Sequence, residues 1–334
     1  LLEISRFWAG KAELDTDTGQ YTIGGVMGPD EFHEKYPDRE TGGLDNNAYT
    51  NLMTAWVIQK TMDILEGMDA ESRESLFEKT GFREEEINSW KEICRRLKLD
   101  ISDDGIIAQY EGYFELEELD WDHYRNKYGN IYRMDRLLKA EGKSPDAYKV
   151  AKQADMLMTY YNLDRKVVDG ILKGLGYELP EDYLAKNLNY YLQRTSHGST
   201  LSRVVHAKLA SMVNDSKLAW DLYLGALTSD YQDVQGGTTA EGIHSGVMAG
   251  TVLAAMHTFA GLDLMGDHVR INPDLPDHWK KISFNFTFKK VNYRCEVSHD
   301  RIMLLPDSDV IVEINGVRRD LLMGEAVDME CPFD

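Results

Sequence analysis

The stretch INPDLPDHWKKISFNFTF, residues 271–288, divides the sequence into two kinds of chain. Before it, apolar residues recur at three- and four-residue spacing, which is typical of helices. From Lys281 onward, apolar and polar residues alternate, as they do in strands with one buried face. Pro273 and Pro276 stand at the change and mark a boundary. The sequence therefore predicts a mainly helical domain followed by a small β domain.

The predicted elements and domains follow from these two patterns. An Asn-Gly pair at 315–316 separates two extended runs, which indicates a hairpin turn. The opening residues read as the middle of a helix and lack a starting Met, so we expect a piece of a longer protein. We expect one domain over residues 1–268 and a second over 269–334. The predicted helices cover residues 46–68, 84–99, 147–162, 184–194, 201–213 and 239–261.

Charge and composition exclude several classes of function. The 334 residues include 57 acidic and 37 basic side chains, a net charge of −20 at pH 7, and such a surface repels nucleic acids and anionic membranes. No apolar run approaches the roughly 18 residues of a membrane span. Cys94, Cys295 and Cys331 lie far apart, which indicates neither a disulfide framework nor a zinc site. We expect a cytoplasmic protein that acts on a neutral partner such as a sugar, without metal or cofactor.

The loop GVMGPDEFHEKYPD, residues 25–38, carries many groups that can move protons. A general acid for glycoside cleavage must keep its proton near neutral pH, which requires partial desolvation or neighbouring negative charge. Val26, Met27 and Phe32 could line such a pocket around Glu31. The competing interpretation is a solvated acidic turn, because Asp and Glu are common in loops. Composition by itself favours the turn.

Two further segments offer groups that could bind sugar hydroxyls. In LDNNAYTN (44–51), Asn47 and Asn51 lie four residues apart and share a helix face, where their amides supply donors and acceptors. Lys152 and Gln153 lie in a later predicted helix and could grip hydroxyls or an anion. A single lysine on a helix surface is also ordinary.

Two predicted helix starts are suited to an anion. In RTSHGSTLSRVVHAKLA (194–210), Ser199 and Thr200 directly precede a helical pattern. Free N–H groups and the helix dipole favour negative charge at such a position. A simple N-cap is the competing interpretation. The segment QGGTTAEGIHSG (235–246) repeats the arrangement and adds His244.

Six segments, in this order, resemble glycoside hydrolase family 65, which includes maltose, trehalose, kojibiose and nigerose phosphorylases and a few hydrolases. They are GVMGPDEFH, LDNNAYTN, KQAD, SHGSTLS, TAEGIHSG and LPDHWKKISF, and they span most of residues 20–285. The resemblance implies a mainly α fold, part of an (α/α)6 barrel of helical hairpins followed by a C-terminal β-sandwich. Complete members carry an N-terminal β domain and the first half of the barrel, so this chain resembles their C-terminal part.

The resemblance also implies roles for individual residues. Glu31 is expected to be the general acid, and Lys152 and Gln153 are expected to contact the sugar. Inorganic phosphate is the expected co-substrate, bound by Ser199, Thr200 and His244.

Three functions remain in competition. The first is inverting phosphorolysis of an α-glucosyl disaccharide of the maltose, trehalose, kojibiose or nigerose type, which yields β-glucose 1-phosphate. The second is inverting hydrolysis with Glu241 as base, although Thr238 and Glu241 also fit a capping box. The third is an inactive carbohydrate-binding fragment. We expect a homodimer, or assembly with the missing N-terminal part of the same enzyme.

Overall fold

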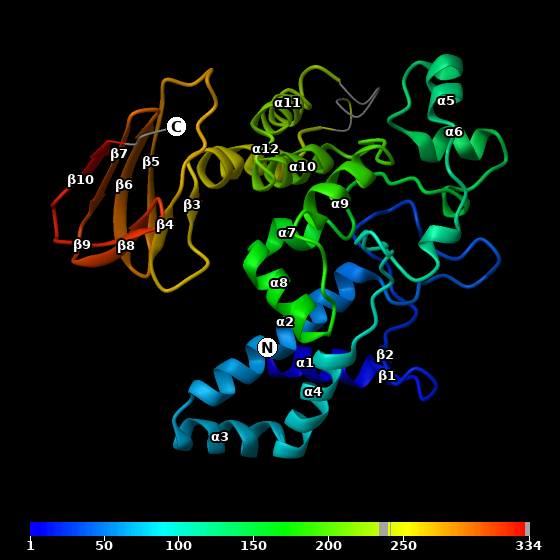
Figure 1. Cartoon of the computed structure of the whole chain (residues 1–334), viewed down its shortest axis with the longest axis horizontal. Coiled ribbons are helices and arrows are strands. Elements are labelled where there is room, and N and C mark those ends of the chain that lie inside the picture. The colour runs from blue at the N-terminus through cyan, green and yellow to red at the C-terminus, as the bar shows by residue number, and fades with distance from the viewer. Residues whose placement is uncertain (234–239, 241, 331–334) are drawn as a thin grey trace. The chain divides into compact units, whose positions relative to one another are not determined.

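The computed structural model describes residues 1–233, 240 and 242–330. The chain divides into two compact units, Leu1–Ser202 and Arg203–Asp334 (Figure 1). Among the described residues, no helix is both long enough and apolar enough to cross a membrane.

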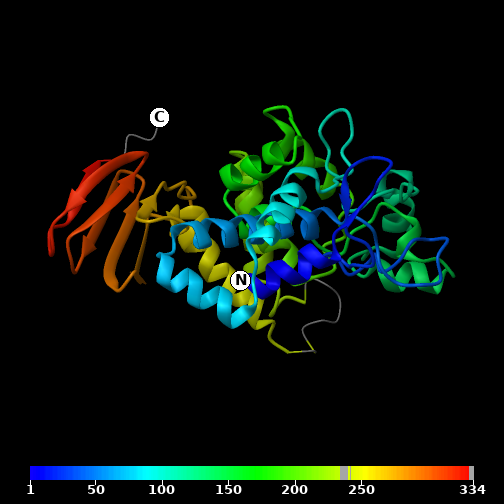
Figure 2. The same cartoon turned by 90° about the horizontal axis from the view of Figure 1, so that it is seen from below.

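The first unit consists mainly of helices joined by long irregular segments (Figures 1 and 2). Its elements are α1 (Leu2–Lys11), β1 (Glu13–Leu14), β2 (Tyr21–Thr22), α2 (Ala48–Gly67), α3 (Ala70–Thr80), α4 (Glu84–Arg96), the 3-10 helix η1 (Tyr113–Glu115), α5 (Trp121–Tyr128), α6 (Met134–Ala140), the 3-10 helix η2 (Pro145–Ala147), α7 (Met158–Asn162), α8 (Arg165–Gly174) and α9 (Tyr183–Leu192).

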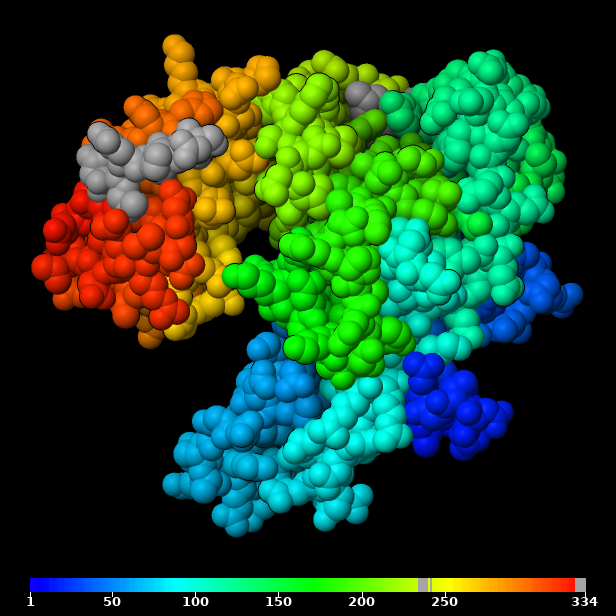
Figure 3. Space-filling view, viewed as in Figure 1, coloured from blue at the N-terminus to red at the C-terminus, as the bar shows by residue number. Residues whose placement is uncertain are grey.

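Helix α2 is central to this unit, because it packs against α1, α4, α7 and α8. Its first turn is capped by Asn47, whose side chain accepts a hydrogen bond from the backbone N–H of Thr50 at 2.9 Å. Leu52 and Ile58 are fully buried on it. Helix α3, in contrast, buries no residue, and the α3–α4 pair forms a projecting part of the unit (Figure 3).

The second unit combines helices with a β-sandwich (Figures 1 and 2). Helix α10 (Thr200–Met212) begins in the first unit and continues into the second. The remaining elements are α11 (Ser216–Leu227), α12 (Ser245–Leu253), the π-helix η4 (Ala254–Phe259), β3 (Leu262–Asp263), β4 (Val269–Ile271), β5 (Lys281–Phe288), β6 (Val291–Ser298), β7 (Arg301–Pro306), β8 (Val310–Ile314), β9 (Val317–Leu321) and β10 (Val327–Glu330).

The sandwich consists of two four-stranded sheets, ordered β10-β7-β6-β5 and β3-β4-β8-β9. Both sheets contribute to one hydrophobic core, for example through Cys295 of β6 and Val312 of β8. Strand β5 alternates between more and less exposed positions, as its sequence predicts. The predicted hairpin turn is confirmed: Asn315 and Gly316 have φ of 49° and 76°, the left-handed values that a tight hairpin requires.

Aromatic side chains join the helices of the second unit to its sandwich. The Trp220 ring of α11 stacks on His278 at 4.8 Å, and Trp220, Tyr223 and Phe259 all pack edge-on against Trp279. The segment before β5 is therefore held on α11. The proposed domain boundary between residues 268 and 269 lies within this compact unit and stays a prediction.

The sequence predicts the fold class correctly: a mainly helical part of an α/α barrel precedes a small β-sandwich. Helices α2, α4, α9 and α10 are confirmed close to their predicted bounds. The predicted helix over 147–162 is wrong, because only η2 and the short α7 are helical there. Residues 239 and 241 of the last predicted helix lie outside the described residues.

Candidate active site

The loop that carries Glu31 is fixed by backbone pairing and by buried side chains. Val26 and Leu44 exchange two backbone hydrogen bonds, of 3.1 and 2.7 Å, at its start. On either side of Glu31, Asp30 and Phe32 are buried, and Phe32 belongs to a hydrophobic cluster with residues of α5 and α6. Glu31 is thus an exposed residue between two anchored ones.

The Glu31 carboxylate pairs with a residue distant in sequence. Its Oε2 accepts a hydrogen bond from Nζ of Lys152 at 2.7 Å, and the two side chains are 62% and 18% exposed. The apolar pocket predicted from Val26, Met27 and Phe32 does not enclose this carboxyl, because Val26 and Phe32 are buried in the interior while Met27 is itself exposed. The site is an open carboxylate–ammonium pair.

Lys152 and Gln153 lie in an irregular segment, which corrects the helix predicted over 147–162. Asp30 Oδ1 accepts hydrogen bonds from the backbone N–H groups of both residues, at 2.7 and 3.3 Å. The side chain of Gln153 donates to the carbonyl of Pro29 at 2.6 Å. Its Oε1 is buried and has no partner among the described residues. These long-range bonds satisfy N–H groups that a helix would have paired internally.

A buried polar network lies against the loop, and the sequence did not reveal it. Asp155 accepts hydrogen bonds from Asn47 Nδ2 at 2.8 Å and from the Asp30 N–H at 3.1 Å. Burial, followed by the Asp30 carboxylate, raises the pKa of Asp155 to about 7. Burial lowers the pKa of His33, but the carboxylates of Asp30 and Asp146 and the Tyr148 carbonyl together outweigh burial, so the pKa of His33 is raised overall. In the sequence, the signals for this network were Asp155 in KQAD and His33 in GPDEFH.

The segment before α10 lies beside Lys152. Ser196 N–H donates to the carbonyl of Ala151 at 2.8 Å. A Cβ on Gly198 would come within 2.3 Å of the Tyr132 carbonyl oxygen and 3.3 Å of Lys152 Cγ, so only glycine permits this approach. The structure therefore brings the predicted Ser-Thr loop next to the Glu31–Lys152 pair.

Ser199 and Thr200 lie at the start of α10, as predicted. The Ser199 hydroxyl accepts a hydrogen bond from the N–H of Leu201 at 3.3 Å, whereas Thr200 is buried. The contact made by Ser199 agrees with a helix-capping role. The N–H groups at such a helix start are also those that would hold an anion.

His244 lies in the second unit, at the start of α12. Asp230 accepts hydrogen bonds from both the backbone N–H and Nδ1 of His244, each at 2.8 Å. We assign the ring proton to Nδ1, because it faces a carboxylate, and Nε2 is then the nitrogen suited to a ligand. Glu241 and Thr238 lie outside the described residues.

The asparagines of residues 44–51 serve the fold. Asn47 caps α2 and contacts Asp155, while Asn51 donates to the carbonyl of Lys98 at 2.7 Å. Both side chains are fully buried. The interpretation of these amides as sugar ligands is therefore wrong, since their hydrogen bonds are internal.

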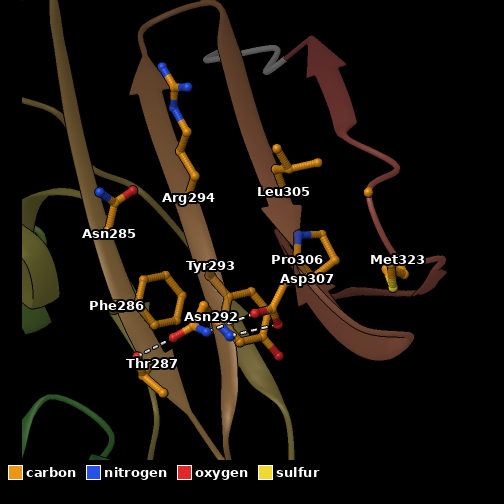
Figure 4. Close-up of a pocket in the computed structure, with 11 residues that line it drawn as sticks. Asn285, Phe286, Thr287, Asn292, Tyr293, Arg294, Leu305, Pro306, Asp307 and Met323 are labelled. Carbon is orange, nitrogen blue, oxygen red and sulfur yellow. Dashed lines mark hydrogen bonds between the residues drawn. The ribbon is translucent and has the colours of Figure 1, made fainter.

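Two cavities flank different parts of the chain. One of about 730 Å³ is lined by α1, the β1–β2 region and Gly24, Gly25 and Asp45, close in sequence to the acid loop. Another of about 550 Å³ lies on β5, β6 and β7 of the sandwich, where Asn292 is hydrogen-bonded to Asp307 (Figure 4). Neither cavity is lined by a predicted site residue. Within the described ranges, no group of three or more His, Cys, Asp or Glu could hold a metal ion.

Two family models match this sequence. The glycosyl hydrolase family 65 central catalytic domain matches residues 1–253, and the family 65 C-terminal domain matches residues 262–321. The first match covers well over half of the chain. The chain belongs to glycosyl hydrolase family 65.

Individual relatives agree with this assignment. Trehalose 6-phosphate phosphorylase from Lactococcus lactis is 45% identical over 314 residues, which cover 94% of this chain and 39% of that protein. An uncharacterized glycosyl hydrolase of Mycobacterium tuberculosis is 42% identical over 335 residues, covering 99% of this chain and 25% of that protein. The chain thus spans between a quarter and two fifths of these curated relatives.

A solved structure has the same fold. The protein named "Putative kojibiose phosphorylase from human microbiome" aligns with a TM-score of 0.75 and 23% identity. The alignment covers 100% of this chain and 45% of that one. At this identity the likeness concerns the fold alone.

Proposed function

We propose that the complete enzyme catalyses inverting phosphorolysis of an α-glucosyl disaccharide. Glu31 protonates the glycosidic oxygen, and inorganic phosphate attacks the anomeric carbon from the opposite face. The bond between that carbon and the oxygen breaks, which releases the acceptor sugar and β-glucose 1-phosphate. The observation that carries the proposal is the Glu31–Lys152 pair at 2.7 Å, beside the segment that leads into Ser199 and Thr200.

The Glu31–Lys152 contact suggests how substrate prepares the acid. We infer that Lys152 transfers its hydrogen bond from Glu31 to a sugar hydroxyl when substrate binds, which leaves the Glu31 carboxyl free to meet the glycosidic oxygen. Gln153, the next residue along the chain, is proposed as the second sugar contact.

Phosphate binding is proposed for Ser199, Thr200 and His244. Because the chain carries a net charge of −20, an anion needs local donors to overcome the global repulsion. Hydroxyls and N–H groups at a helix start provide them. With its proton on Nδ1, the His244 ring adds Nε2 as an acceptor for the O–H of hydrogen phosphate. No organic cofactor or metal enters this reaction scheme.

A hydrolase is the second candidate. It would require another carboxylate about 6.5–9.5 Å from the acid to activate water. Among the described residues near the loop, Asp30 and Asp155 are buried and accept backbone or amide N–H groups, so neither is suited to that role. The phosphorylase names of relatives favour phosphate as the nucleophile.

Trehalose 6-phosphate is the first substrate to assay, together with maltose, trehalose, kojibiose and nigerose. The support is the 45% identity to a trehalose 6-phosphate phosphorylase. Phosphorolysis of this sugar would yield β-glucose 1-phosphate and glucose 6-phosphate.

The decisive experiment is a phosphate-dependence assay on the complete enzyme. Each disaccharide is incubated with and without inorganic phosphate, and the products are identified by NMR. We expect turnover only with phosphate, and the β anomer of glucose 1-phosphate. Equal rates in phosphate-free buffer would establish the hydrolase instead.

The role of Glu31 is tested by replacing its carboxyl with an amide. Glu31→Gln should lower kcat by about 10²–10⁴-fold, the usual contribution of a general acid, with an unchanged melting temperature. Glu34→Gln is the matched control, because Glu34 is another exposed acid on the same loop and should tolerate the change. Full activity of Glu31→Gln would end the assignment.

A further inference from the structure

An exposed loop residue needs a support if it is to act as a catalytic acid. The Glu31 side chain is 62% exposed, and its hydrogen bond to Lys152 joins two flexible side chains. Displacement of a catalytic group by about 1 Å can cost on the order of 10²-fold in rate. The support must therefore lie in the residues that hold the backbones of both partners.

Asp30 joins those two backbones. Its carboxylate accepts hydrogen bonds from the N–H groups of Lys152 and Gln153, at 2.7 and 3.3 Å. Its own backbone N–H donates to Asp155 Oδ2 at 3.1 Å. Asp30 thus connects the acid loop to the lysine segment and to a deeper carboxylate.

Asp155 connects Asp30 to the helical body of the unit. Its other oxygen accepts from Asn47 Nδ2 at 2.8 Å, and Asn47 caps the central helix α2. Gly28 packs so closely on Asp155 that a Cβ there would lie 2.0 Å from Oδ2. Asp155 is only 4% exposed, so water does not compete for these bonds.

We propose that Asp155 is a positioning residue that holds Glu31 against Lys152, acting through Asp30. The inference rests on the proposed role of Glu31 as general acid. Asp155 does not contact the reacting atoms in this scheme. It fixes the backbone immediately before the acid.

The cost of burying this carboxylate supports a role beyond folding. A buried carboxylate loses its hydration, and an apolar group of similar size in its place is often as stable or more stable. Here the acceptor oxygens are directed at one N–H of the acid loop and one amide of the α2 cap. Both partners belong to elements that flank the site.

The test compares Asp155→Asn with a matched control in the complete enzyme. Asp146→Asn is the control, because Asp146 is also buried and accepts N–H groups of Glu34 and Lys35, beyond the acid. At pH 8 we expect Asp155→Asn to lower kcat by about 10- to 100-fold and to leave KM for phosphate nearly unchanged. Asp146→Asn should change kcat much less.

A second readout does not depend on activity. In crystals of the unliganded Asp155→Asn enzyme, the distance between Lys152 Nζ and Glu31 Oε2 should exceed hydrogen-bond length. A retained contact, or equal kcat losses in Asp155→Asn and Asp146→Asn, would overturn the positioning role. If the wild type shows no phosphate-dependent cleavage, the proposed function fails, while the crystal comparison still decides the role of Asp155.

A milder variant covers the case in which Asp155→Asn does not fold. Asn47→Ser keeps an N-cap side chain for α2 but removes the amide that binds Asp155. It should lower kcat in the same direction by a smaller factor. Wild-type kcat in folded Asn47→Ser would count against the proposal.

Discussion

Glu31 and Lys152 are 121 positions apart in the chain, yet their side chains meet at 2.7 Å. The exposed pair contributes little to stability, since such pairs are worth about 0–1 kcal/mol. Its geometry is maintained instead by buried hydrogen bonds of Asp30 and Asp155. At the scale of the residue, the proposed chemistry therefore depends on groups that do not contact substrate.

Gly28 provides a test of this packing. In Gly28→Ala the new Cβ would lie 2.0 Å from Asp155 Oδ2 and 2.3 Å from Asn47 Nδ2, and both side chains are buried and hydrogen-bonded. We expect a loss of about 1–3 kcal/mol in the free energy of unfolding, as in other overpacked sites, together with lower kcat. Chemical denaturation and steady-state kinetics measure the two effects.

Gly170→Ala is the matched control for that substitution. A Cβ on Gly170, within α8, would meet no atom within 4 Å. Replacing this helical glycine by alanine should raise the free energy of unfolding by about 0.5–1 kcal/mol. If both variants behaved alike, the close contact between Gly28 and Asp155 would have no energetic importance.

The pKa of Asp155 predicts a pH dependence of stability. Burial, and then the Asp30 carboxylate, raise this pKa to about 7, while His33 acts in the opposite direction. An unfolded aspartate titrates near 3.9, so between about pH 4 and 7 the folded state holds the proton more strongly. The contribution of Asp155 to the free energy of unfolding should therefore fall as pH rises through this range.

Urea denaturation at several pH values measures that contribution. The wild-type free energy of unfolding should fall more steeply between pH 4 and 7 than that of Asp155→Asn, which cannot titrate at this position. Parallel curves for the two proteins would contradict the raised pKa.

At the scale of the element, residues 147–162 show how tertiary bonds override a helical pattern. The apolar spacing there is that of an amphipathic helix, but Asp30 captures the N–H groups of Lys152 and Gln153. Ala151 also pairs in parallel with Thr195. The irregular backbone that results presents the Lys152 side chain to Glu31.

Helix α11 is predicted to stabilise the second unit through Trp220. This ring stacks on His278 and contacts Trp279 and Phe259, which come from the segment before β5 and from η4. Because Trp220 is only half-buried, Trp220→Ala should lower the free energy of unfolding by about 2 kcal/mol, below the usual loss for a buried tryptophan. Trp220→Phe should lower the free energy of unfolding by a smaller amount, since it keeps an aromatic ring. Denaturation and limited proteolysis at residues 272–279 compare the variants, and equal effects of Ala and Phe would argue against the stacking.

At the scale of the whole molecule, binding can be detected without assuming a reaction. A ligand that binds the native state raises its stability, by about 2.7 kcal/mol at 100 times its Kd. We expect phosphate and glucose each to raise the melting temperature of the complete enzyme, and sodium chloride at matched ionic strength serves as the control for phosphate. No shift with either ligand would count against the proposed phosphorylase.

The surface of the first unit exposes apolar side chains on α1. Ile4 and Phe7 are 51% and 62% exposed and lie three residues apart on one helix face. Exposed apolar side chains that share a helix face can be covered at an interface. Assembly with a second copy, or with more of the same enzyme, stays a prediction.

The sequence by itself determined the fold class, helices α2, α4, α9 and α10, the sandwich and its Asn-Gly turn, because these depend on local periodicity and turn chemistry. Six short motifs in order also identified the family, which the family models confirm. Only the tertiary structure decided that Lys152 meets Glu31, that Asn47 and Asn51 serve the fold, and that Asp155 supports the acid loop. These features depend on hydrogen bonds between residues up to 125 positions apart. Local patterns cannot encode such contacts, because only packing brings the partners together and excludes the water that would otherwise compete.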